Sequence, residues 1–190
     1  MSRFALRPVL SLAALLLASP AALAHPGEGS HAGHLMAGML HPLTGLDHVL
    51  MIVAVSAWSA LLPMHGRIAV AACLALFVGV GALLPVGGGP LLESAIALTV
   101  VGSGLLLAIG RRAPLWASGA LAAGFALIHG FAHGAEGPAQ SGLYVPGLVI
   151  STALLAALVS QAAVRLSAHA SFLRIAGAAS AAVGAAALTA

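Results

Sequence analysis

The sequence predicts an all-α membrane protein, a polytopic bundle of about six transmembrane helices that follows a cleaved signal peptide. Of its 190 residues, 61% are hydrophobic and only 6% are charged, whereas a soluble domain usually carries about 25% charged residues. The apolar residues also occur in runs of roughly 20, the length that a helix needs to cross a bilayer. The first partner that we predict is therefore the lipid bilayer.

The first 24 residues have the layout of a secretory signal. Two arginines precede an apolar stretch, which is followed by a Ser-Pro break and by small residues at positions 22 and 24. We expect cleavage after Ala24. Residues 25–36 would then form a periplasmic tail rich in histidine, and residues 37–190 would form a six-helix transmembrane domain.

The six spans follow from the apolar runs between polar or glycine- and proline-containing breaks. We expect them at residues 37–62, 67–87, 91–110, 114–135, 143–165 and 171–189. Their ends carry the aromatic residues Trp58, Trp116 and Tyr144. Aromatic rings are enriched at the membrane–water interface, and we expect all three there.

The arginines predict the orientation of the bundle. All five that follow the signal lie in or beside the connections after the first, third and fifth spans, namely Arg67, Arg111, Arg112, Arg165 and Arg174. Short loops rich in arginine stay in the cytoplasm. The protein is therefore expected in a bacterial inner membrane, with the mature N-terminus and the C-terminus in the periplasm.

The high isoelectric point does not indicate a nucleic-acid partner. The value of about 10.6 reflects a shortage of acidic residues, and the arginines are scattered instead of forming the basic patch that phosphates need. The chain also lacks a P-loop motif, so we do not expect it to hydrolyse ATP. No prosthetic group is expected.

Ionisable residues inside a span are costly and usually functional, and the first span contains three of them. His41 and His48 are seven residues apart and share a helix face, while Asp47 lies at the edge of that face. Pro42 and Gly45 are expected to loosen the first turns of this span and to free carbonyl groups toward a cavity.

The fourth span carries a second motif. His129 and His133 are one helical turn apart, and Glu136 follows three residues later on the same side. The third span opens with Glu93. The predicted orientation places all these groups in the outer half of the bundle, where imidazole and carboxylate at one depth suit Ni²⁺, Co²⁺ or Zn²⁺. Alternatives are hydrogen bonding between helices, a proton relay, and, for Asp47, orienting His41 or a histidine of the fourth span.

The tail after the signal adds His25, His31 and His34. A short tract rich in histidine is typical of metal binding, and cleavage after Ala24 would give His25 a free α-amine beside its imidazole. We interpret the tail as a collector of metal before handover. The alternative is a glycine-rich tail whose histidines are incidental.

The two motifs, His41-x5-Asp47-His48 and His129-Gly-x-Ala-His133-Gly-x-Glu136, resemble those of the HupE/UreJ family of hydrogenase and urease accessory permeases. The resemblance covers nearly the whole chain, including the signal and the span that contains Glu93. It implies a nickel permease, with cobalt as a second cargo, that is linked indirectly to hydrogenase or urease maturation. Ile128 departs from the aromatic residue that the family often has before the histidine, a packing position.

These observations predict a secondary transporter that imports Ni²⁺ or Co²⁺. One alternative is a sensory or structural membrane subunit that binds metal without moving it. Another is an intramembrane metalloenzyme, since His129 and His133 have the spacing of a zincin. Gly130 stands where a zincin needs glutamate, so we do not expect an enzyme. The sequence leaves open whether the protein is a monomer or a homo-oligomer.

Overall fold

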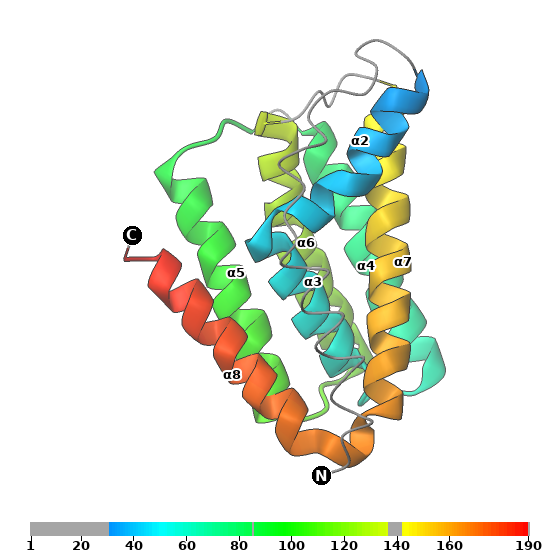
Figure 1. The fold of residues 1–190 in the computed structure, drawn as a ribbon, viewed down its shortest axis with the longest axis vertical. Coiled ribbons are helices and arrows are strands. Elements are labelled where there is room, and N and C mark those ends of the chain that lie inside the picture. Colours follow the sequence, from blue (N-terminus) through cyan, green and yellow to red (C-terminus); the bar gives the residue numbers. More distant parts are fainter. Residues whose placement is uncertain (1–30, 85, 137–141, 190) are drawn as a thin grey trace, which may run out of the picture.

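The computed structural model describes residues 31–84, 86–136 and 142–189, which form a bundle of α-helices without a strand (Figure 1). In chain order the helices are α2 (His31–Thr44), α3 (Leu46–Ser59), α4 (Met64–Leu83), α5 (Pro90–Ile109), α6 (Leu115–Glu136), α7 (Tyr144–Arg165) and α8 (Ala170–Ala187), the last preceded by the 3₁₀ turn η1 (Ser167–His169). Five of these are long and apolar enough to cross a membrane, and α2 and α3 together make a sixth candidate span. The predicted all-α membrane bundle is confirmed. The predicted signal peptide lies outside the described residues.

The last five predicted spans each correspond to one helix, with ends that differ by four residues or fewer. Glycines with positive φ set two of the boundaries. Gly89 (φ 132°) precedes Pro90, which opens α5, and Gly110 (φ 62°) ends it in the left-handed conformation that favours glycine at a helix C-terminus. The apolar runs were therefore sufficient to locate these helices.

The first predicted span is not a single helix. α2 and α3 meet at Gly45 and are bent by 77°. Pro42 lies inside α2 without a backbone N–H to donate, and Gly45 has an extended backbone (φ −87°, ψ 120°) that interrupts the helix. α3 has 14 residues, or roughly 21 Å, which is short of the ~30 Å hydrocarbon core. The two helices still qualify together as one broken span. The break at Gly45 is larger than the loosened first turns that we expected, and α2 begins at His31, inside the segment expected to be a tail.

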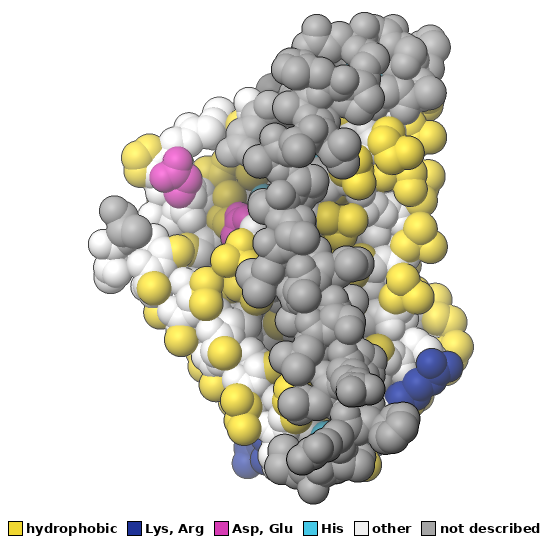
Figure 2. Space-filling view, viewed as in Figure 1, with side chains coloured by type: hydrophobic (Ala, Val, Ile, Leu, Met, Phe, Trp, Pro, Cys, Tyr) yellow, Lys and Arg dark blue, Asp and Glu magenta, His cyan; other side chains and the backbone are white. Residues whose placement is uncertain are grey.

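The connections that carry the arginines meet at one end of the bundle, which we call the arginine end. There the indole Nε1–H of Trp58 donates a hydrogen bond of 2.8 Å to the carbonyl oxygen of Arg111, and Arg67 lies 3.5 Å from the side-chain oxygen of Gln161. In the face shown in Figure 2, arginine side chains lie toward this lower end and acidic side chains lie in the upper half. Charge is thus separated along the bundle, as the predicted orientation requires.

Two of the three aromatic side chains expected at the membrane interface are buried instead. Trp58 and Tyr144 are each only 1% exposed, whereas Trp116 is 78% exposed. Trp58 turns inward because its ring N–H bonds the Arg111 carbonyl. Tyr144 turns inward to contact the ring of His41, with 5.7 Å between the ring centroids. Only the Trp116 ring is exposed on the described bundle, and its place at the membrane interface stays a prediction.

Glycines allow close contact between helices on both sides of the polar motifs. A Cβ atom on Gly130 would collide with the Val78 carbonyl oxygen and lie 2.7 Å from Cα of Gly81, so α6 packs directly against the backbone of α4. A Cβ atom on Gly38 would likewise collide with the Tyr144 carbonyl oxygen, where α2 packs on α7. Because the glycine face of α6 packs on α4, the adjacent face, which carries the histidines, is directed toward α3.

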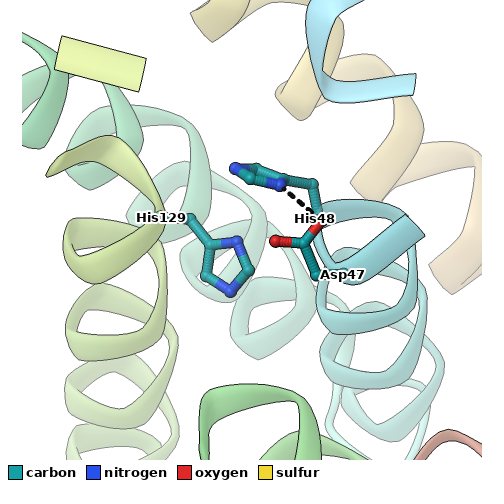
Figure 3. A group of neighbouring side chains, drawn as sticks. All are labelled: Asp47, His48 and His129. Carbon is teal, nitrogen blue, oxygen red and sulfur yellow. Dashed lines mark ion pairs between the residues drawn. The ribbon is translucent and has the colours of Figure 1, made fainter. Parts of the chain in front are cut away.

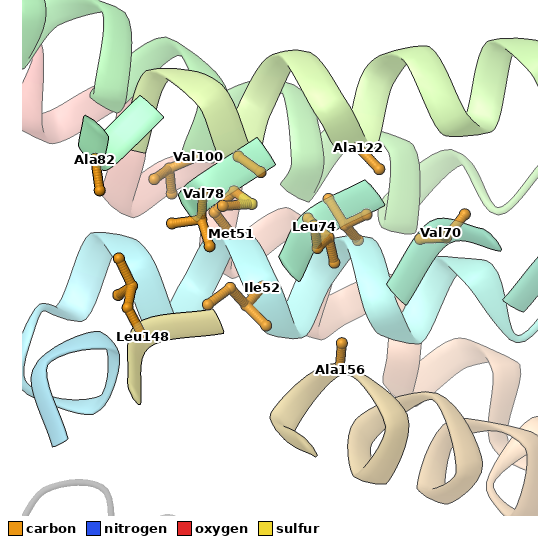
Figure 4. Packing of buried hydrophobic residues seen from close by; sticks show 12 residues of the cluster. Met51, Ile52, Val70, Leu74, Val78, Ala82, Val100, Ala122, Leu148 and Ala156 are labelled. Carbon is orange, nitrogen blue, oxygen red and sulfur yellow. The ribbon is translucent and has the colours of Figure 1, made fainter. Parts of the chain in front are cut away.

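An apolar layer fills the bundle between the polar motifs and the arginine end. Its fully buried members include Met51 and Val55 of α3, Leu74 of α4 and Ala126 of α6, each 1% exposed or less. They lie within a cluster to which α5 and α7 also contribute (Figure 4). The cluster also contains Val78 and Ala82, which pack beside Gly130 and Gly134 at the level of the histidines. We call Met51, Val55, Leu74 and Ala126 the apolar layer, because they lie nearer the arginine end.

Candidate metal site

The histidines of both sequence motifs meet where α2 ends, α3 begins and α6 passes beside them. Their rings form a continuous row. The centroids of His41 and His133 are 4.7 Å apart, those of His133 and His48 are 4.4 Å apart, and those of His48 and His129 are also 4.4 Å apart. We call these four residues the histidine row. Three separate helices thus bring four imidazoles into contact, as the predicted depth of the two motifs suggested.

One end of the row has the geometry of a metal site. Asp47, His48 and His129 can each offer a ligand atom, and these atoms lie within 4.8 Å of one another (Figure 3). Two ligands about 2.1 Å from one ion can be at most ~4.2 Å apart, so small side-chain rotations would suffice to bind an ion. Oδ1 of Asp47 is 3.0 Å from Nδ1 of His48. This pair has the distance of an ion pair, and neither ring nitrogen of His48 makes a hydrogen bond among the described residues.

Several ring nitrogens of His48, His129 and His133 are buried without a hydrogen-bond partner among the described residues. His129, His133 and His48 are 0%, 1% and 8% exposed. Nδ1 of His129, Nε2 of His48 and both ring nitrogens of His133 make no hydrogen bond among the described residues. A buried polar atom without a partner costs roughly 1–3 kcal/mol, and several at one point are rarely retained unless they serve a ligand. This chemistry fits a transition-metal ion, which imidazole nitrogen binds well.

The helix break also favours a cation. Carbonyl groups at a helix C-terminus carry partial negative charge, and His41 lies in the last turn of α2. The positive end of α3 faces the same place, and Asp47 in its first turn offsets it. Broken transmembrane helices are a recurring way to place ion sites in transporters.

Two residues near the row were not predicted as part of the site. Oγ1 of Thr99, on α5, lies 2.6 Å from Nε2 of His129, and Tyr144 packs against His41. The available signals were weak, since Thr99 is one hydroxyl in an apolar run and Tyr144 sits at a helix start where an interface role was expected. The contact of Tyr144 joins α7 to α2, which are far apart in the sequence, whereas the contact of Thr99 joins the consecutive helices α5 and α6.

The remaining predicted ligands are not brought into the row by the described contacts. Glu93 is exposed in the first turn of α5. His34 is partly buried in the first turns of α2, seven residues before His41 and on the same helix face. His31 opens α2 and Glu136 ends α6, but their side chains lie outside what the structure describes, as does His25. Their roles as ligands stay predictions.

Comparison with known proteins decides the family. The chain matches the family described as HupE / UreJ protein over residues 13–187. It belongs to this family. It is also 38% identical over 149 residues to Protein HupE of Rhizobium leguminosarum bv. viciae, an alignment that covers 76% of each chain. No solved structure matches it significantly.

Membership confirms the resemblance that the two motifs indicated. HupE/UreJ proteins are hydrogenase and urease accessory proteins, a group of accessory and transport proteins and not a known enzyme class. Together with the apolar helices, membership makes this chain a multi-pass membrane protein.

Proposed function

We propose that this HupE/UreJ protein imports Ni²⁺, with Co²⁺ as a second cargo, across a bacterial inner membrane to supply enzymes such as hydrogenase or urease. The observation that carries the proposal is the histidine row, in which buried ring nitrogens of His48, His129 and His133 lack hydrogen-bond partners beside the break between α2 and α3. Imidazole with one carboxylate suits both ions, and the preference for nickel comes from the family.

The row suggests an order of contacts for the ion. α6 runs from the arginine end outward, so His133 lies one turn nearer the outside than His129. An ion would first meet His41 and His133 and would then pass through His48 to the group of Asp47, His48 and His129. The side chain of Asp47 is 40% exposed, so an ion can also reach this group without passing along the whole row.

Passage toward the cytoplasm requires the helices to move. The apolar layer lies beyond the site and is closed by fully buried side chains such as Val55 and Leu74. The 77° bend at Gly45 is a suitable hinge, because only a few backbone angles need to change there. The membrane potential favours entry of a dication by roughly 2.3 kcal/mol per charge per 100 mV. We therefore propose that the protein transports the ion by alternating access and not as an open channel.

The deciding experiment measures uptake of radioactive nickel by cells that lack their own nickel importers. Uptake should appear with the wild-type protein and fall to background with His48→Ala at equal amounts in the membrane. His65→Ala is the matched control, because His65 is exposed at the arginine end, far along the bundle from the row. Loss of uptake in both variants, or in neither, would contradict the proposed site.

The same experiment separates the alternatives. A purified protein that binds nickel while cells take up none would indicate the sensory or structural subunit. An intramembrane metalloenzyme has little support, because Gly130 occupies the position of the zincin glutamate and is pressed against the α4 backbone. A glutamate side chain has no room there.

A further inference from the structure

The hydroxyl of Thr99 lies between a backbone carbonyl and a ring of the histidine row. Its Oγ1 is 2.6 Å from the carbonyl oxygen of Ile96 in the same helix and 2.6 Å from Nε2 of His129 on α6. Thr99 is 3% exposed and His129 is fully buried, so water cannot readily exchange with either contact. The hydrogen in each of these two contacts must therefore come from Thr99 or His129, and not from water.

Counting hydrogens gives the direction of both bonds. A hydroxyl has a single hydrogen, and a carbonyl oxygen can only accept. The Thr99 hydroxyl therefore donates to Ile96, a common bond of threonine within helices. The short contact to His129 is then favourable only if Nε2–H donates to Oγ1 of Thr99. The opposite arrangement would hold two oxygen atoms 2.6 Å apart with no hydrogen between them.

This direction determines which nitrogen of His129 can bind an ion. A neutral imidazole with hydrogen on Nε2 has its lone pair on Nδ1. Nδ1 of His129 is buried without a hydrogen-bond partner. In Figure 3 one ring nitrogen of His129 faces the Asp47 carboxylate and the other turns away from it, and the facing nitrogen is the one beside the ring carbon that bears the side chain.

We propose that Thr99 is a positioning residue that holds His129 as the Nε2–H tautomer, so that Nδ1 is the atom that binds the transported ion. This inference rests on the proposed function and deepens it. It brings α5 into the site, although that helix contributes no imidazole. A histidine ligand commonly donates its second ring N–H to a fixed acceptor, and loss of that acceptor usually costs roughly 10–100-fold in metal affinity.

The test compares two substitutions at one position. Thr99→Val keeps the shape of the side chain and removes the hydroxyl, whereas Thr99→Ser keeps the hydroxyl. Ser103→Ala is the matched control, because Ser103 lies one turn further along α5, is fully buried and bonds the Val100 carbonyl at 3.1 Å. Nickel binding to the purified full chain in lipid nanodiscs should weaken roughly 10–100-fold in Thr99→Val, and stay at the wild-type value in Thr99→Ser and Ser103→Ala.

A spectroscopic readout tests the tautomer without any metal. In protein with ¹⁵N-labelled histidine, the resonances of His129 are those lost in His129→Asn. They should show a protonated Nε2 and an unprotonated Nδ1 in the wild type and in Thr99→Ser, and a changed distribution in Thr99→Val. A hydrogen on Nδ1 in the wild-type protein would overturn the inference even if Thr99→Val fails to fold.

Failure of this inference is distinguishable from failure of the proposed function. If folded Thr99→Val binds nickel as tightly as the wild-type protein does, the role of Thr99 is overturned and the proposed transport function still stands. Wild-type protein that binds neither Ni²⁺ nor Co²⁺ would overturn the proposed function, and with it the assignment of Nδ1 as a ligand.

Discussion

The two halves of the bundle differ in the kind of side chain that they bury. Toward the arginine end, α3, α4 and α6 meet through Val55, Leu74 and Ala126, each without exposed surface and without a polar atom to satisfy. Toward the other end, the same α3 and α6 meet through His48 and His129, which are also buried but leave ring nitrogens unpartnered. The half toward the arginine end is stabilised by apolar packing, whereas the other half is destabilised by buried polar atoms that lack partners.

The contrast extends to the backbone. The helices are continuous around the apolar layer, whereas the polar half contains the bend of 77° between α2 and α3. Irregular backbone at membrane depth is tolerated only where it is buried in protein or lines a cavity. The break and the unpartnered imidazoles therefore mark the same place, the one where the bundle can change shape around an ion.

The largest expected effect comes from removing a ring of the polar half. His133→Leu removes a ring that contacts both His41 and His48 and should lower nickel affinity by roughly 10–100-fold, the usual cost of losing a group beside a metal ligand. Both ring nitrogens of His133 lack partners, so the same change should leave the melting temperature equal or higher. Calorimetric titration and thermal unfolding in nanodiscs measure the two effects. A variant that loses affinity only because it unfolds would refute the division between the halves.

A smaller effect is expected at the break. Gly45→Ala would place a Cβ atom 2.8 Å from Nδ1 of His48 and 2.9 Å from Oδ1 of Asp47. The backbone of Gly45 suits alanine, so these two side chains would have to shift. Displacements below 1 Å should weaken nickel binding about tenfold. Gly124→Ala on α6, where a Cβ atom meets nothing within 4 Å, is the control. Equal affinity in both variants would show that the position of the His48–Asp47 pair does not limit binding.

The sequence predicted depth in the membrane better than it predicted direction around each helix. Spans and arginines were enough to expect His48 and His129 at one level, because both depend on length and charge. Glu93 was expected at that level too, but it is six residues from Thr99, a rotation of about 240°, and it is exposed. Which face a helix turns inward depends on packing between distant segments, such as Gly81 against Gly130.

The break and the Thr99 contact illustrate the same limit. Pro42 and Gly45 are visible in the sequence, but glycine and proline are common in transmembrane helices and do not by themselves give a bend of 77°. Thr99 is an ordinary membrane threonine until α6 brings His129 within 2.6 Å of it. Contacts between residues 30 positions apart leave no local pattern in one sequence.

A modest effect is expected from the histidines before the row. Replacing His25, His31 and His34 together by alanine should raise the nickel concentration for half-maximal uptake a few-fold and leave the maximal rate unchanged, because these residues would collect metal without moving it. Uptake measured over a range of nickel concentrations separates the two parameters. Complete loss of transport would make the segment essential, and an unchanged curve would favour incidental histidines.

The smallest effect on metal binding is expected from the apolar layer. Leu74→Ala removes a fully buried side chain of α4 and should cost roughly 1–3 kcal/mol of stability, because only the cavity and packing part of such a change applies inside a bilayer. Nickel affinity should stay at the wild-type value, since Leu74 packs among apolar side chains, one turn nearer the arginine end than Val78, which lies beside Gly130. The rate of uptake is the informative quantity. If the layer must open for each ion to pass, a looser layer should transport faster at unchanged affinity. A drop in nickel affinity would instead show that the packing of the apolar layer controls the geometry of the metal site.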